Sequence, residues 1–321
     1  MQFAPIVLFV YNRPWHTRQT LEALSKNALA NQSELFVFAD GPKISATEVD
    51  LENIKEVRSI VKEQNWCKTV NIIESDTNKG LANSIIEGVT KIVNEYGKII
   101  VLEDDLITSF GFLKFMNDAL NVYEYENRVM HISGYMYPVD TQLPQTYFLN
   151  TATCWGWATW ARAWKYFESD ANVLRDRVDR TNNIRKFNIE NGYDFYEHLK
   201  ANTEKRIHTW AIKWYATIFL NKGFSLHPYP SLTNNIGHDG QGVHCGESDL
   251  YTWKEIAQSI EVKPQALVES KKARKYFAKF FKAQGFKIYP YDSKFKYQIR
   301  IFLEKLLPNL LTNSYYRLRK N

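Results

Sequence analysis

The sequence predicts an α/β protein built on a mostly parallel β-sheet that is flanked by helices. Short apolar runs typical of buried strands alternate four times with amphipathic helical stretches in the first part of the chain. One of these runs, 99–102, is apolar at every position, as expected of a central strand that is covered on both faces. Alternation of this kind is typical of parallel strands whose connecting helices pack on the sheet.

The elements of the first half are each bounded by a sequence signal. Strands are expected at four apolar runs, which span 6–11, 35–39, 70–73 and 98–102. The helices are expected to open at Thr17, to follow a capping box at 45–48, and to span 81–96 and 110–123.

The second half is predicted to be less regular. Strands are expected at 129–133 and 224–227, a polar helical insertion at 170–205, and an apolar stretch at 210–220. The segment 231–245 reads as a long loop rich in Gly, Asn and His, which is typical of an active-site lid.

The composition is that of a folded soluble protein, with 45% hydrophobic and 24% charged residues. No apolar run approaches the roughly 20 residues that a membrane-spanning helix needs, and the first apolar run is too short for a signal peptide. The three cysteines are widely spaced and form no CxxC pair, which favours reduced thiols over disulfides or a zinc site. We therefore expect a cytoplasmic location.

The positive charge of the chain is concentrated at its C-terminal end. Residues 270–321 hold 14 Lys and Arg against two acids, whereas the rest of the chain holds 27 against 33. We therefore predict a body, 1–265, and a basic helical extension, 266–321. The extension interleaves cations with aromatic residues, which favours an anionic membrane surface over nucleic acid as its partner. A helix that docks on the body through its aromatic face is the alternative.

Three carboxylates, Glu103, Asp104 and Asp105, follow the central apolar run directly. Neighbouring side chains of a strand point to opposite faces, and clustered carboxylates repel one another. A divalent cation, Mn²⁺ or Mg²⁺, bound by carboxylate oxygens would remove both problems. The alternative is an acidic turn that caps the helix beginning near Ser109.

Polar residues also follow the other strands of the predicted sheet. They lie at the carboxyl ends of the runs, where ligands bind in open α/β sheets: Asn12, Arg13, Asp40, Lys79 and Gly80. Because these ends meet at one edge of the sheet, we expect the residues to share a site.

Two further groups of residues suit a sugar and a metal. Trp155, Gly156 and Trp157 form a Trp-rich segment, and an aromatic wall of this kind can hold the apolar face of a sugar ring. Core packing is the alternative for each of these tryptophans. His244 in the glycine-rich loop is either a metal ligand or a surface histidine.

The chain resembles the GT-A nucleotide-sugar glycosyltransferases. It is similar to the inverting enzymes related to N-acetylglucosaminyltransferase I and to bacterial sugar transferases of surface polysaccharides. The resemblance covers about residues 3–250, and six short segments carry it: 10–13, 38–40, 78–82, 103–105, 154–157 and 237–240. It implies a nucleotide-binding half at 1–125 and an acceptor half at 126–265.

The resemblance also implies roles for individual residues. Arg13 and Asp40 would hold the nucleotide, Asp104 would contact the ribose, and Asp105 would bind the cation that bridges the diphosphate. The donor, most simply a UDP-sugar, would further contact Tyr11, Asn12, Lys79, Gly80 and Glu103. Trp155, Gly156, Trp157 and Trp210 would face a glycan or lipid-linked acceptor.

Inversion at the sugar needs a base for the acceptor hydroxyl, and here the chain departs from the family. The family places an acidic residue just before a tryptophan, where this chain has His208 and Thr209 ahead of Trp210. His208 is the first candidate for the base, with Asp239 and Glu204 as alternatives.

Two other functions remain open. The chain is either an active transferase or a degenerate one that acts as a binding partner, and His208 favours the second of these. A sugar nucleotidyltransferase would need a glycine-rich loop after the first strand, which 11–14 does not contain.

Overall fold

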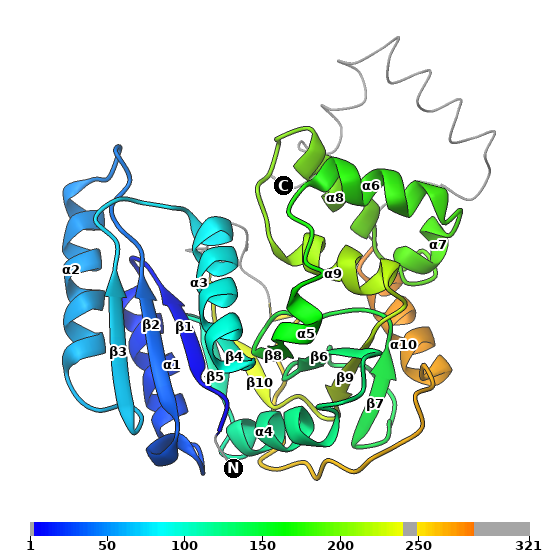
Figure 1. Cartoon of the computed structure of the whole chain (residues 1–321), viewed down its shortest axis with the longest axis horizontal. Helices are drawn as coiled ribbons and strands as arrows, with labels where there is room; N and C mark the ends of the chain where they lie inside the picture. The colour runs from blue at the N-terminus through cyan, green and yellow to red at the C-terminus, as the bar shows by residue number, and fades with distance from the viewer. Residues whose placement is uncertain (1–2, 240–248, 286–321) are drawn as a thin grey trace.

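A computed structural model of the chain describes residues 3–239 and 249–285. Its main feature is one eight-stranded sheet with the order β3-β2-β1-β4-β8-β6-β9-β7. The first four strands in that order are parallel to their neighbours, and β8 joins β4 and β6 as an antiparallel strand. The predicted α/β class with a mostly parallel sheet is confirmed, and the pairs of this sheet that are antiparallel all involve strands from the second half of the chain (Figure 1).

The elements of the first half begin and end close to the predicted positions. They are β1 (Ile6–Val10), α1 (Pro14–Ser25), η1 (Ala30–Gln32), β2 (Glu34–Ala39), α2 (Glu48–Lys62), β3 (Thr69–Glu74), α3 (Leu81–Tyr96), β4 (Lys98–Glu103), β5 (Leu106–Thr108) and α4 (Phe112–Val122).

The second half contains a larger number of short elements. They are β6 (Val129–Ser133), β7 (Thr146–Leu149), β8 (Trp157–Trp160), α5 (Ala161–Trp164), α6 (Ala171–Arg180), α7 (Ile184–Phe187), α8 (Phe195–Thr203), α9 (Ala211–Leu220), β9 (Phe224–Pro228), β10 (Thr233–Asn235) and α10 (Lys271–Ala283).

Alternate residues of the central strands supply two separate cores. Leu8 and Leu102 face the helices α1, α2 and α4, whereas Phe9 and Val101 face α3, α5 and α9. A third cluster joins α6, α7 and α8 to the outer side of α9, so these helices form a further layer (Figure 1). Burial on both faces explains why the run 99–102 is apolar throughout.

Two local predictions are corrected by the structure. The capping box of α2 lies two residues later than expected, because Thr47 and Asp50 exchange the two capping hydrogen bonds. Helix α1 begins at Pro14 rather than Thr17, since proline is favoured in the first turn, where its missing N–H costs nothing.

Helix α10 packs on the body through its aromatic face. Phe277 and Phe281 are almost fully buried, beside Tyr137 and Phe195. The described part of the basic extension therefore docks on the body through its aromatic face, which was the alternative to a membrane-binding helix. Residues 286–321 lie outside the described residues. Over the ranges that the structure covers, no helix is long and apolar enough to cross a membrane.

Candidate functional site

The guanidinium of Arg13 lies among three carboxylates at the carboxyl ends of β1 and β4. Its Nη1 atom is 2.9 Å from Oδ2 of Asp105 and 3.7 Å from Oδ1 of Asp104, and its Nη2 atom is 3.8 Å from Oδ1 of Asp239. The other oxygen of Asp239 lies 3.0 Å from Nε2 of His16. The structure thus brings together four residues from three distant parts of the sequence, and it adds His16.

A two-stranded sheet holds this cluster in place. Strand β10 pairs antiparallel with β5, which begins directly after the acidic triplet. As a result, Asn235 donates a 3.3 Å hydrogen bond to Oδ1 of Asp105, and the amide of Ile236 donates to its carbonyl. Gly237 lies so close that a Cβ atom there would be 2.2 Å from Oδ2 of Asp105. The expected loop 231–245 therefore contains a strand, and that strand fixes the approach of Gly237.

The cluster carries more negative charge than Arg13 neutralises. Burial and the neighbouring charge of Asp105 raise the pKa of Asp104 to about 7, while Arg13 acts in the opposite direction. Burial, with Asp105 and Asp104, raises the pKa of Glu103 well above its usual range. An added cation would lower both pKa values, because it favours the charged carboxylates.

The acidic triplet does not cap a helix in this structure, so that alternative is wrong. Helix α4 begins at Phe112 after Gly111, and no acidic residue lies in its first turn. The triplet is separated from that helix by β5.

The carboxylates of this cluster suit a hard divalent cation that takes its remaining ligands from the phosphates of a substrate. Among the described residues, no group of three or more His, Cys, Asp or Glu is arranged to hold a metal. Magnesium is commonly held by one or two carboxylates together with substrate phosphates, and Asp105 with Asp104 provides such a pair. Arg13 now lies against Asp105, so it would have to share or leave that oxygen. His244 lies outside the described residues.

Arg13 itself has unused hydrogen-bonding capacity. Its Nε and Nη2 atoms are buried and have no hydrogen-bond partner among the residues that the structure describes. A buried guanidinium normally uses all its donors, and its planar fork matches the oxygens of a phosphate. Arg13 also precedes the first turn of α1, where no side chain caps the helix. The positive end of the helix and Arg13 therefore favour an anion at the same place.

Asp40 organises the turn that leads into α3. Its two carboxylate oxygens accept hydrogen bonds from the amides of Gly41, Lys79 and Gly80 and from the side chain of Asn78. Gly80 has φ of +78°, a conformation that suits glycine. Four donors thus surround the carboxylate of Asp40 and fix its position at this turn, and its contact with a nucleotide stays a prediction.

A hollow of about 220 Å³ lies beside this turn. It lies between the ends of β2 and β3 and the start of α3, and its lining includes Phe38, Asp40, Ser75, Lys79 and Ser84. The side chain of Lys79 forms an ion pair with Glu87 at 2.6 Å.

Tyr11 and Asn12 lie on the other side of the strand ends. The amide of Asn12 donates a 2.9 Å hydrogen bond to Asp50 at the start of α2. The ring of Tyr11 lies under the ammonium of Lys43, and burial raises the pKa of its hydroxyl. Tyr11 also contacts the acidic cluster, because its backbone forms a hydrogen bond with the carboxyl group of Asp104 and so acts to lower the pKa of Asp104.

The predicted sugar wall is corrected for most of its members. Trp157 is fully buried and stacks on Trp210 at 5.2 Å, so both belong to the core between the sheet and α9. Gly156 is buried as well, with φ of +77°. Only Trp155 is partly exposed, in a cluster with Tyr135, His238 and Tyr251. Hence Trp155 is the one predicted tryptophan of the wall that a sugar can reach.

The three candidate bases occupy different surroundings. Glu204 is exposed and paired with Arg206 at 2.6 Å and Lys200 at 3.4 Å. Asp239 belongs to the Arg13 cluster. His208 is exposed, and its Nε2 atom lies 3.1 Å from Oδ1 of Asn83 in the first turn of α3. Burial and the charge of Lys213 lower the pKa of His208, so its ring is neutral at pH 7, as a base requires.

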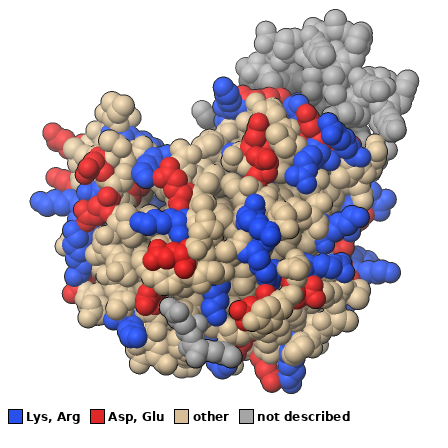
Figure 2. All heavy atoms as spheres, viewed as in Figure 1, with Lys and Arg blue, Asp and Glu red and all other residues tan. Residues whose placement is uncertain are grey.

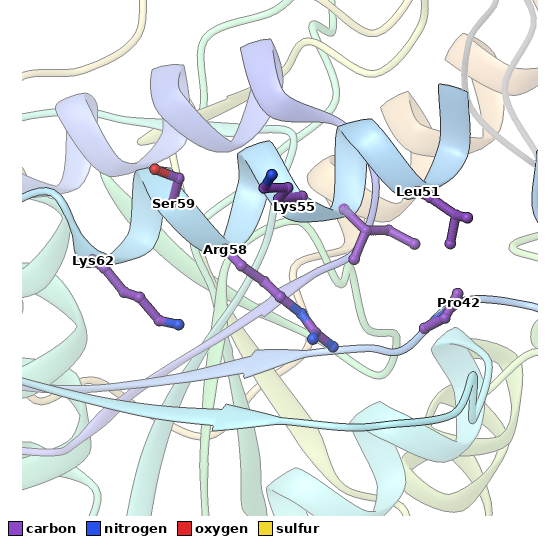
Figure 3. A pocket seen from close by; sticks show the side chains of 7 residues that line it. Pro42, Leu51, Lys55, Arg58, Ser59 and Lys62 are labelled. Carbon is purple, nitrogen blue, oxygen red and sulfur yellow. The ribbon is translucent and has the colours of Figure 1, made fainter. Parts of the chain in front are cut away.

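A larger hollow, of about 450 Å³, lies away from this cluster between α2 and the sheet (Figure 3). Lys55, Arg58 and Lys62 line it with Pro42, Leu51, Ile54 and Ser59. Arg58 and Lys62 already pair with Glu74, and Arg58 also donates to the carbonyl of Ser75. The Nε atom of Arg58 is buried without a hydrogen-bond partner among the described residues, as in Arg13, but the lining of this hollow contains no carboxylate that could hold a cation beside it.

Sequence reasoning missed His16 and Asn235. His16 lies one helical turn after Arg13 and is buried, a spacing that predicts a shared face. Asn235 carried no signal, because its contact with Asp105 depends on the pairing of β10 with β5.

No family model matches the chain, and no curated protein matches it either. Solved structures similar to it include S. aureus TarS, with 17% identity over 45% of this chain and 23% of that chain, at a TM-score of 0.29. A mannosyltransferase, PcManGT from Pyrobaculum calidifontis in complex with GDP-Man and Mn²⁺, has 9% identity over 68% of each chain, at a TM-score of 0.36. A UDP-glucose pyrophosphorylase complexed with UDP-glucose has 12% identity over 70% of this chain and 90% of that chain, also at 0.36.

The chain thus spans about a quarter of the length of TarS. Because identities and TM-scores are this low, the function proposed below depends on the geometry of this chain alone. The described residues form a mixed α/β sheet, with an arginine and an acidic pair at the carboxyl ends of two adjacent parallel strands.

Proposed function

We propose that this protein is an inverting, metal-dependent glycosyltransferase that moves a sugar from a nucleotide sugar, most simply a UDP-sugar, to a glycan or lipid-linked glycan. We infer that it acts in the synthesis of a surface polysaccharide or glycan. The observation that carries the proposal is Arg13, with two buried donor atoms that have no hydrogen-bond partner among the described residues, beside Asp104 and Asp105. An anion site and a cation site at one point suit a diphosphate with its divalent ion.

The donor would lie across the carboxyl ends of β1, β2 and β4. Arg13 and the uncapped start of α1 would bind the diphosphate. The nucleoside would extend along the strand ends, past Tyr11 and the turn that Asp40 holds. Asp104 would accept from the ribose, with Glu103 on the opposite face of β4 near Cys154.

Mn²⁺ or Mg²⁺, when bound by Asp105, would neutralise charge that develops on the departing diphosphate. The chain's own residues then orient the reaction. The acceptor hydroxyl oxygen attacks the anomeric carbon, the bond from that carbon to the diphosphate oxygen breaks, and the hydroxyl proton passes to a base. We assign the base to His208, because its ring is neutral at pH 7 and its Nε2–H donates to Oδ1 of Asn83, which leaves Nδ1 as the nitrogen that takes the proton. Trp155 would pack against a sugar of the acceptor.

Calorimetric titration of UDP tests the donor site. We expect binding that strengthens with Mn²⁺ in the native chain and is weakened by roughly tenfold or more in Arg13→Met, since a charge-assisted hydrogen bond is lost. Arg18→Met is the matched control, because Arg18 lies on the same helix but pairs with exposed Glu63. Negligible heats with and without Mn²⁺ would exclude the proposal.

A degenerate transferase that binds nucleotide without turnover is the second candidate, and the absence of an acidic residue at positions 208 and 209 favours it. A UDP-release assay against candidate acceptors separates the two. Turnover that disappears in His208→Asn supports the enzyme, whereas UDP binding without release supports the degenerate form.

We further propose peripheral attachment to the cytoplasmic face of an anionic membrane through the basic extension. Because the aromatic face of α10 is buried, only its exposed lysines are available, among them Lys275, Lys279 and Lys282. Charge reversal of these three should lower sedimentation with phosphatidylglycerol vesicles and leave that with phosphatidylcholine unchanged. Equal sedimentation of the variant and native chains would contradict the attachment.

A further inference from the structure

Charge does not mark a binding surface on the face of the molecule shown in Figure 2, because Lys and Arg are interspersed there with Asp and Glu. Aromatic side chains are gathered more selectively. Three partly exposed rings contact one another in series, namely Trp155, Tyr251 and Phe280. The ring centroids are 5.6 Å apart in the first pair and 6.1 Å apart in the second. We call these three side chains the aromatic strip.

Strand β10 fixes the start of the aromatic strip beside the acidic cluster. Asn235 donates a hydrogen bond to Asp105, and Thr233 of the same strand donates a 2.8 Å hydrogen bond to the carbonyl of Trp155. Two residues of a strand span about 7 Å, so one short strand holds both ends of this contact. Trp155 therefore lies close to the carboxylate that would bind the cation.

The middle of the aromatic strip is held by its backbone. The hydroxyl of Tyr135 donates a 2.7 Å hydrogen bond to the carbonyl of Tyr251. Two residues further on, Trp253 exchanges two hydrogen bonds of 2.9 Å with Asn234 of β10. A ring whose backbone is already fixed loses less conformational freedom when a ligand packs on it.

The last ring of the aromatic strip belongs to the C-terminal extension. Phe277 and Phe281 are buried and hold α10 on the body, whereas Phe280 is partly exposed. The Phe280 ring lies 5.4 Å from that of Tyr137 and 6.1 Å from that of Tyr251. Helix α10 thus completes a surface that begins at the acidic cluster.

We propose that the aromatic strip binds successive sugars of an oligosaccharide acceptor, the first on Trp155 and later ones on Tyr251 and Phe280. A sugar ring has an apolar C–H face that packs on an aromatic ring and a polar rim that stays in water, which suits partly exposed rings. The indole and the phenol of the strip also carry a polar group. The assignment rests on the proposed function, and it narrows the acceptor to a chain of at least two sugars.

The test applies the full chain, without donor, to an array of immobilised monosaccharides and linear oligosaccharides. We expect binding to oligosaccharides and not to monosaccharides. Calorimetry with the oligosaccharide that binds best should give an affinity roughly three- to tenfold weaker in Phe280→Ala, because one stacking contact is lost. Binding to no member of the array, equal binding of monosaccharides, or equal affinity of the variant overturns the proposal.

Tyr276→Ala is the matched control for the change on α10. Tyr276 is a partly exposed aromatic residue of the same helix, and its ring lies 5.8 Å from the ammonium of Lys279. Its replacement should leave the affinity for the oligosaccharide unchanged. An equal loss in Tyr276→Ala and Phe280→Ala would mean that both act through the docking of the helix, and it would refute a contact with sugar.

Phe280→Leu separates a sugar from a lipid chain as the occupant. Leucine keeps an apolar side chain but removes the flat ring, so Phe280→Leu should bind the oligosaccharide as weakly as Phe280→Ala. It also serves as the second variant if Phe280→Ala does not fold. Farnesyl phosphate is the lipid probe. If it binds equally to the native chain and Phe280→Leu while no oligosaccharide binds, the strip holds a lipid chain and the proposal is overturned.

Titration of UDP with Mn²⁺ distinguishes a failure of this inference from a failure of the proposed function. A native chain that binds UDP but no oligosaccharide refutes the acceptor strip and leaves the nucleotide-sugar site standing. A native chain that binds oligosaccharides, with the loss in Phe280→Ala, but no UDP refutes the glycosyltransferase and leaves the strip as a surface that binds glycans.

Discussion

Arg13 acts as the counter-charge of three carboxylates, and its replacement by methionine should show how much they depend on it. Methionine keeps most of the side-chain length and removes the charge. In the native cluster the guanidinium lies 2.9 Å from Asp105, 3.7 Å from Asp104 and 3.8 Å from Asp239. Without it, these carboxylates repel one another in a site that water reaches only in part.

The magnitude follows from the burial of the partners. Removing one member of a fully buried pair costs roughly 3–5 kcal/mol, and an exposed pair is worth about 0–1 kcal/mol. The side chains of Arg13 and Asp105 are 15% and 16% exposed, so we expect a loss of about 2–3 kcal/mol in the free energy of unfolding.

The loss should depend on pH. Arg13 lowers the pKa of Asp104, so its removal raises that pKa further above the unfolded value of about 3.9. A raised folded pKa stabilises the protonated form, and that contribution is lost as pH rises through the folded pKa. Arg13→Met should therefore be more destabilised at pH 8.5 than at pH 6.

Denaturant unfolding at both pH values, with and without Mn²⁺, measures these effects. A divalent cation can take the place of the guanidinium on Asp105, so Mn²⁺ should restore more stability to Arg13→Met than to the native chain. Arg18→Met, whose ion pair with Glu63 is exposed, should lose no more than about 1 kcal/mol. If both variants behave alike and neither responds to Mn²⁺, the carboxylates do not depend on Arg13 and the reasoning is refuted.

Three other predictions concern the site, the core and the extension. Gly237→Ala places a Cβ atom 2.2 Å from Oδ2 of Asp105, which must then move. Because Oδ2 is the end of a movable side chain, Mn²⁺ binding measured by calorimetry should weaken while the melting temperature changes by less than about 3 °C. Unchanged Mn²⁺ binding would contradict the close approach. Burial lowers the pKa of His131 to about 3 and that of His227 to about 4, so both are neutral when folded and each should cost about 2 kcal/mol of stability between pH 7.5 and pH 5. Unfolding curves of His131→Gln should accordingly lose less stability over that pH range than native curves, and parallel losses would rule this out. Phe277→Ala on α10 should cost about 3–5 kcal/mol in urea unfolding, because the ring is fully buried; a loss below about 1 kcal/mol would mean that α10 does not dock on the body.

The sequence by itself determined the parallel half of the sheet and which strand ends carry polar residues. Period and composition are local properties, so the apolar runs of β1, β2, β3 and β4 and the helices between them could be recognised without tertiary information. The same reasoning placed Arg13 and the acidic triplet at one edge, because parallel strands end together.

Only the tertiary structure decided what completes the site. The pairing of β10 with β5 joins positions more than a hundred residues apart, and it brings Asn235 and Gly237 onto Asp105. The tertiary structure also leaves Trp155 partly exposed and buries Trp157 completely. The two tryptophans lie two residues apart in one segment, so the hydrophobic pattern of the sequence could not predict this difference. Such contacts depend on which surfaces pack together, and long-range packing leaves no periodic trace in the chain.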